Sequence, residues 1–141
     1  MKQREAFSRI FAGMRADLHD YRDLRELLEA QFLAALEHRS ADICDIGARI
    51  TALAATLEQR RAERAALAAL LVPRGGRIAM RTVAQRLQGA SRSAFDTCWS
   101  ALETAVRDCK DLNLRNCRLL MDQHDIMQRV LHAEPDTYAP A

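Results

Sequence analysis

The amino-acid sequence predicts an all-α protein, built as an elongated antiparallel helical bundle or coiled-coil-like hairpin. Nearly half of the 141 residues are hydrophobic, and most of these are alanine and leucine, which favour helices over strands. Glycine and proline are rare, so they interrupt only a few long segments. Apolar residues recur at steps of three, four or seven, which is the spacing of one helical face. We therefore expect three long helices and one short helix.

The first two helices are predicted at 2–38 and 41–71. The first has an apolar stripe, and its other face carries acidic residues that include Asp17, Asp20 and Glu26. Ser40 and Asp42 are residue types that satisfy free amides where a helix begins. The stripes of the two helices consist of Met14, Leu18, Tyr21, Leu28, Phe32 and Leu36, and of Ile43, Ile46, Ile50, Leu53, Leu57, Leu67 and Leu71.

The second stripe becomes charged at Arg60 and Arg64, and two interpretations are open there. The arginine stems can lie along apolar surface while the guanidinium groups reach water and pair with Glu58 or Glu63. Alternatively, the two cations form an electrostatic point at which a partner docks.

The last two helices are predicted at 79–88, with Val83 and Leu87 facing inward, and at 91–132. The last helix would be about 60 Å long, which exceeds what a compact domain of this mass requires. Part of its apolar face is therefore expected to project past the bundle. The single helical domain would span 1–133, and 134–141 are predicted to form a flexible tail. The stripe of the last helix consists of Phe95, Cys98, Trp99, Leu102, Val106, Cys109, Asn113, Asn116, Leu120, Met127 and Leu131.

Composition argues against a nucleic-acid or membrane protein. The net charge is only +2, and the one basic excess, five arginines against one aspartate, lies at 73–96 without interleaved aromatic residues or a reader motif. No apolar run approaches the roughly 20 residues that cross a bilayer, and no secretory signal is present. The four cysteines follow no disulfide pattern. We expect a cytoplasmic protein with no nucleic-acid partner and no direct membrane insertion.

The sequence also lacks a plausible enzyme site. Cys109, Cys117 and His124 are the nearest approach to a metal set, but the two cysteines lie about 12 Å apart along one helix. Zinc ligands must all lie about 2.0–2.3 Å from the metal, so these residues are better interpreted as ordinary core and surface positions. We predict no catalysis, no metal and no cofactor.

Two amides interrupt the apolar stripe of the last helix, at Asn113 and Asn116. An amide on an apolar seam must find hydrogen-bond partners or lose roughly 1–3 kcal/mol. These amides either set the register between helices, as polar seam residues do in coiled coils, or meet the backbone of a partner.

With this motif the chain resembles the FlgN family of flagellar type III export chaperones. The resemblance rests on Asp111-Leu112-Asn113, Asn116 and Leu119-Leu120, with Trp99 upstream and Tyr138 beyond the last helix. The segment 57–61 also looks like the corresponding stretch of the second helix. Two departures are Cys117, where the family usually has glycine, and Ala139, where it has glycine after the tyrosine.

The resemblance implies a chaperone that binds the C-terminal helical segments of hook–filament junction (hook-associated) proteins and prevents their premature assembly. It also implies delivery to the membrane export gate and the export ATPase complex, with the tail tyrosine offered to the gate. The partner-binding residues would be Asn113, Asn116, Leu119, Leu120, Met127, Val130, Leu131 and Tyr138. The competing interpretation is a self-associating helical coiled-coil adaptor or scaffold.

Overall fold

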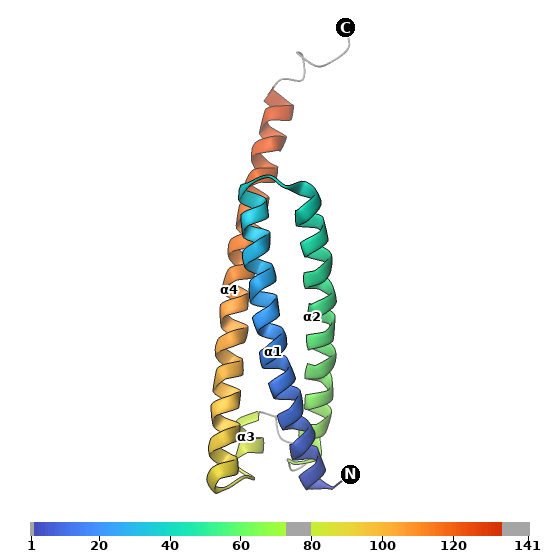
Figure 1. Ribbon diagram of the computed structural model, residues 1–141, viewed down its shortest axis with the longest axis vertical. Coiled ribbons are helices and arrows are strands. Elements are labelled where there is room, and N and C mark those ends of the chain that lie inside the picture. Colours follow the sequence, from blue (N-terminus) through green and yellow to red (C-terminus); the bar gives the residue numbers. More distant parts are fainter. Residues whose placement is uncertain (1, 73–79, 134–141) are drawn as a thin grey trace.

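The computed structural model describes residues 2–72 and 80–133, and it confirms the all-α class (Figure 1). The described residues contain helices and turns but no strand. Three helices are long and one is short, as predicted. Their bounds are α1 Gln3–Leu36, α2 Ser40–Ala69, α3 Met80–Ala84 and α4 Gly89–Ala133.

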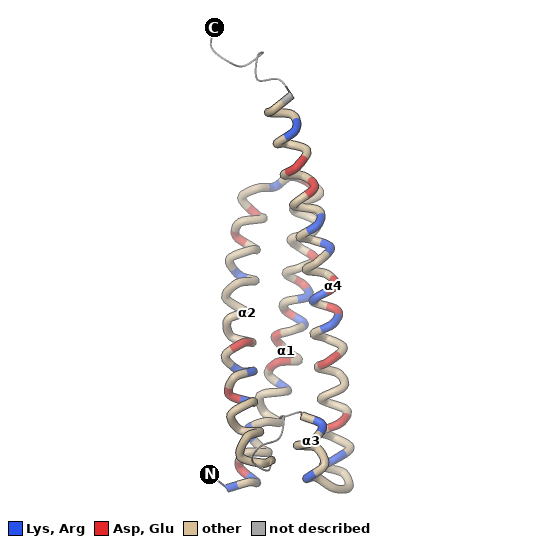
Figure 2. The backbone as a smooth tube through the Cα atoms, turned by 180° about the vertical axis from the view of Figure 1, so that it is seen from behind, with Lys and Arg blue, Asp and Glu red and all other residues tan. Residues whose placement is uncertain are grey.

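The helix α1 lies between α2 and α4 and packs against both (Figures 1 and 2). The helices α2 and α4 do not pack against each other to a similar extent. The chain reverses between α1 and α2 at His38, which has a φ of 55°. The helix α2 is therefore antiparallel to α1. After α3, the chain reverses again, so α4 runs parallel to α1.

The pairing of α1 with α4 follows a heptad register. Three hydrogen bonds run from side chains of α4 to backbone carbonyl oxygens of α1. They recur at seven-residue steps on both helices, which is the spacing of a coiled-coil seam. They join Cys109 Sγ to the Tyr21 carbonyl oxygen (3.6 Å), Asn116 Nδ2 to the Leu28 carbonyl oxygen (2.7 Å) and Gln123 Nε2 to the Ala35 carbonyl oxygen (2.9 Å). We call this heptad series on α4 the α1-facing column; it comprises Phe95, Leu102, Cys109, Asn116, Gln123 and Val130.

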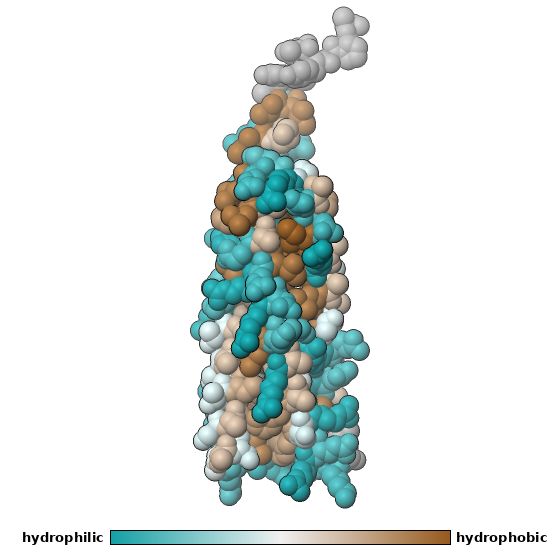
Figure 3. All heavy atoms as spheres, viewed as in Figure 1, coloured by the Kyte–Doolittle hydropathy of each residue, from teal (hydrophilic) through white to brown (hydrophobic). Residues whose placement is uncertain are grey.

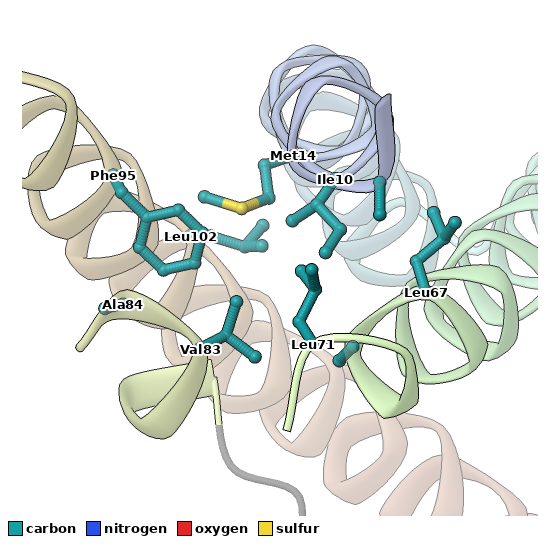
Figure 4. Close-up of a cluster of buried hydrophobic side chains, with 10 residues drawn as sticks. Ile10, Met14, Leu67, Leu71, Val83, Ala84, Phe95 and Leu102 are labelled. Carbon is teal, nitrogen blue, oxygen red and sulfur yellow. The ribbon is translucent and has the colours of Figure 1, made fainter. Parts of the chain in front are cut away.

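The main hydrophobic core lies at the end of the bundle where α3 meets the three long helices (Figure 4). Val83 of α3 is fully buried there, and the rings of Phe11 and Phe95 meet edge to face with centroids 5.4 Å apart. Burial of these side chains supplies the main driving force for closing this end. The buried cluster consists of Ala6, Ile10, Met14, Leu67, Ala68, Leu71, Val83, Ala84, Phe95 and Leu102.

The short helix differs most from its prediction, because it ends at Ala84 rather than at residue 88. Backbone hydrogen bonds from Arg86 to Val83 (3.1 Å) and from Leu87 to Ala84 (3.0 Å) tighten the chain into a turn. Gly89 then begins α4 with a φ of 62°, a left-handed conformation that glycine adopts without steric cost. The inward positions of Val83 and Leu87 are confirmed.

Arg60 and Arg64 pair with α1, which corrects the prediction for this region. Arg60 donates to Asp17 (2.6 Å) and Asp20 (2.8 Å), and Arg64 donates to the other oxygen of Asp17 (2.6 Å). Asp17 is 1% exposed, so placing it on the solvent face was wrong. The expected pairing with Glu58 was also wrong, because that carboxylate binds Arg61. The hydrogen bond that Arg60 donates to Asp17 raises the pKa of Arg60, which favours the charged form of this guanidinium.

We predict that Asp17→Ala lowers the free energy of unfolding by about 3 kcal/mol, because it leaves two partly buried guanidinium groups without their shared carboxylate. Urea unfolding followed by circular dichroism measures this loss. Asp23→Ala is the matched control, since that carboxylate is 51% exposed, and we expect a change within about 0.5 kcal/mol. Equal unfolding midpoints for the two variants would contradict a structural role for the cluster.

Candidate partner-binding surface

The helix α4 extends well past the end of α1, as the length of its sequence pattern predicted (Figure 1). The α1-facing column makes its last hydrogen bond to α1 where Gln123 meets Ala35, and α1 ends one residue later at Leu36. The helix then continues to Ala133, a further stretch of about 15 Å. We call the part of α4 from 124 to 133 the projecting end.

The projecting end keeps the apolar face that α4 buries lower down. Val130 follows Gln123 by one heptad, so it occupies the next position of the α1-facing column, yet no described helix lies opposite it. Apolar atoms are visible on this part of the surface, next to the grey atoms in Figure 3. A cluster of large exposed apolar side chains makes this surface a candidate for partner binding. Its exposed fractions are 59% for Ile126, 57% for Met127, 49% for Val130 and 56% for Leu131.

The two seam asparagines have different environments. Asn116 is 1% exposed, and its amide donates to the Leu28 carbonyl oxygen (2.7 Å) and to Gln31 Oε1 (2.9 Å). Its own oxygen accepts from Arg115. The amide of Asn116 is thus engaged inside the bundle, in the position of a register residue. Asn113 is exposed. Among the described residues, its side-chain oxygen accepts one weak hydrogen bond, from the Cys117 thiol at 4.0 Å.

The remaining predicted site residues are divided between the bundle and the projecting end. Leu119 and Leu120 are partly buried near the last contact with α1, whereas Met127, Val130 and Leu131 are exposed together. Tyr138 lies outside the described residues. The sequence prediction missed Ile126, although it follows Leu119 by one heptad and therefore continues the same face.

The cysteines that the sequence analysis considered are free thiols, and two arginines of the basic segment have partners within the protein. All four cysteines are free, and burial raises the pKa of the Cys109 and Cys98 thiols, which makes them poorer nucleophiles. In the basic central segment, Arg86 donates to the Leu71 carbonyl oxygen and Arg92 pairs with Asp96, while residues 74 and 77 lie outside the described residues.

Among the described residues, the one group of potential metal ligands that lie close together is His19, Asp20 and Asp23. Asp20 already accepts a hydrogen bond from Arg60, and His19 is an exposed surface side chain. Over residues 2–72 and 80–133, no helix combines the length and apolar character that crossing a bilayer requires.

The structure is a bundle of long helices in which the apolar end of α4 has no neighbour among the described helices. The family model of the FlgN protein matches residues 1–133. The chain therefore belongs to the FlgN family, the flagellar export chaperone family, which is not a family of enzymes. No curated protein and no solved structure matches it.

We predict that Asn116→Ala destabilises the protein by about 1–3 kcal/mol, because it removes a buried amide from Leu28 and Gln31. Asn113→Ala, the same change at an exposed position three residues away, should alter the stability by less than about 0.5 kcal/mol. Thermal and urea unfolding of the two variants give the comparison. Equal stabilities would show that the Asn116 amide does not set the register of α1 and α4.

Proposed function

We propose that this flagellar export chaperone binds the C-terminal helical segments of hook–filament junction proteins through the projecting end of α4. Binding in the cytoplasm would keep these clients from assembling early and present them to the export machinery. The protein would act by binding and release alone, with no chemical turnover and no cofactor.

The observation that carries this proposal is the heptad face of α4 that continues after α1 has ended. Up to Gln123 the α1-facing column packs on α1, and from there it is open to another helix. A client helix that lies against Ile126, Met127, Val130 and Leu131 would extend the seam that α1 forms lower down. Recognition of this type reads apolar anchors at steps of three and four, which are the spacings of these four residues.

The side chains of the projecting end suit a surface that accepts more than one client. Met127 is unbranched and has a polarizable sulfur, so it adapts its shape to different partners. Ile126 and Val130 supply branched apolar surface on the same face, and their burial is worth roughly 1.5–3 kcal/mol per side chain. Leu119 and Leu120, partly buried where the projecting end begins, would border the client.

Delivery would use a second element, the segment that follows α4. By resemblance to its family, Tyr138 would contact the membrane component of the export gate, which acts together with the export ATPase complex. Client binding and gate contact would then rest on separate residues, Met127 and its neighbours for the first and Tyr138 for the second. Separate residues allow the two steps to be tested one at a time.

We expect the double variant Met127→Glu and Val130→Glu to lower client affinity at least tenfold without changing the melting temperature. Two carboxylates on the contact face would oppose its desolvation, whereas the exposed positions contribute little to the bundle. Calorimetric titration with C-terminal segments of the hook–filament junction proteins measures the affinity. A negative heat-capacity change should accompany binding by the unmodified chain.

The matched control is Gln128→Glu with His132→Glu, which adds two carboxylates to exposed positions on the other side of the projecting end. This control should bind clients normally. If both double variants bind like the unmodified chain, the projecting end is not the client site. A fixed high-order oligomer in light scattering, with no client binding, would instead support the scaffold interpretation.

We predict that Tyr138→Ala leaves client affinity within about twofold and reduces secretion of the hook–filament junction proteins. The residue lies beyond the helix that we assign to client binding, so its loss should affect only the later step. Calorimetry gives the affinity, and immunoblotting of culture supernatants gives secretion. Normal secretion by this variant would remove Tyr138 from the mechanism.

A further inference from the structure

A second apolar surface, distinct from the projecting end, lies between α2 and α4. At the end of the bundle that holds the core, α3 lies over the junction of the three long helices (Figure 4). Beyond Trp99 no described element continues in the position of α3, and a groove of about 490 Å³ lies there. We call this groove the trough; its lining includes Tyr21, Leu24, Leu28, Ile50, Ala54, Leu57, Trp99, Val106, Cys109 and Asn113.

The trough has the length and the surroundings that one more packed helix would require. Its floor is α1, and its two walls are α2 and α4, which flank α1 in Figure 2. Along α4 it extends from Trp99 to Asn113, about 21 Å, which is the length of roughly four helical turns. Because α3 already occupies the same position at one end, a helix fits the trough better than an extended segment or a compact ligand.

The lining is apolar along its floor and over most of its walls, and its charged residues are three cations and Glu58. Arg61 and Arg64 lie on the α2 side with Glu58, and Lys110 lies on the α4 side. Arg107 lines the adjoining hollow beside Trp99, together with Glu103. Arg61 forms an ion pair with Glu58 on the same helix, and Arg64 forms one with Asp17 of α1. Among the described residues, neither Arg107 nor Lys110 forms an ion pair within 4.0 Å.

We infer that the trough binds an amphipathic helix of a partner protein whose apolar stripe is flanked by carboxylates. The apolar stripe would cover the partly exposed side chains of Leu24, Ile50 and Val106, and the carboxylates would meet the cations on both walls. This inference goes beyond the proposed function, because the trough is a different surface from the projecting end and is tested without a flagellar client.

A partner helix fits the charge pattern better than a second copy of this chain. Among the described residues, the longest exposed apolar helix end that a second copy offers is the projecting end, whose acidic and arginine side chains are Asp125 and Arg129. Such an end carries one arginine and one aspartate, so it does not supply carboxylates along both of its flanks. Self-association is therefore an outcome that the test must exclude.

The single tryptophan of the chain reports directly on the trough, because Trp99 lines it and lies 5.7 Å from the Arg64 guanidinium. The probes are two synthetic peptides of about 18 residues, long enough to form a helix, with the same leucine stripe and either glutamate or lysine flanks. We expect the glutamate peptide to change Trp99 emission saturably and to bind at least tenfold more tightly than the lysine peptide.

Charge reversal of the free cations tests the recognition itself. The double variant Arg107→Glu and Lys110→Glu keeps Arg61 and Arg64 on the α2 side, so the preference should be lost and the two peptides should bind within about twofold of each other. Both residues are exposed, so the fold should be unaffected. Arg118→Glu, an exposed change on α4 outside the trough, should leave the preference as it is.

Blocking the trough from the α2 side gives an independent test. Ala54 is exposed and lines the trough, whereas Ala55 is exposed and does not. We expect Ala54→Glu to weaken glutamate-peptide binding at least tenfold and Ala55→Glu to leave it within about twofold. The variant Met127→Glu and Val130→Glu should bind the peptide normally, which separates this site from the client site.

Three results would overturn the inference. The first is equal binding of the two peptides, or binding of neither, by the unmodified chain. The second is equal binding by the Ala54→Glu and Ala55→Glu variants. The third is a change in Trp99 emission with protein concentration alone, accompanied by an increase in mass, which would show that a second copy fills the trough.

Discussion

The parallel seam between α1 and α4 is the constraint on which the rest of the structure depends. Its register repeats every seven residues, from the contact of Cys109 with Tyr21 to that of Gln123 with Ala35. Once this register is set, the length of each helix decides what remains exposed. Because α1 ends at Leu36 and α4 continues to Ala133, the end of α4 is left with an apolar face and no neighbour among the described helices.

Two polar clusters lie inside this apolar framework, and each joins α1 to one of the other long helices. Asn116 ties α4 to α1, and Asp17 ties α1 to Arg60 and Arg64 of α2. Buried polar groups of this kind contribute less to net stability than apolar ones, but a shifted register leaves them without partners. They therefore favour one alignment of three long helices whose stripes of alanine and leucine would otherwise tolerate several.

The periodicity of the sequence was sufficient to predict the all-α class, the long helices and the projection of α4, because each follows from one helical face and its length. It was not sufficient for Asp17, which we assigned to the solvent face although it follows Met14 by three residues and precedes Tyr21 by four. A charge on the stripe of α1 and two on the stripe of α2 indicate a buried pairing only when both helices are considered together. For Asn116 the sequence left two roles open, since hydrogen-bond partners on another helix depend on a register that composition does not reveal.

The trough could not have been predicted by the same method. Stripe analysis treats every apolar residue on a helical face as core, which is right for Leu57, but it does not ask which helix covers the partly buried Val106. Because α2 and α4 do not pack on each other as each packs on α1, the three long helices leave a gap between them, and α3 is one short helix that fills it at a single level. A bundle built in this way keeps apolar surface at two places, beside Trp99 and at the end of α4. Apolar surface that stays exposed contributes no burial energy to the isolated protein. The same two surfaces are the ones that we propose for the packing of other helices.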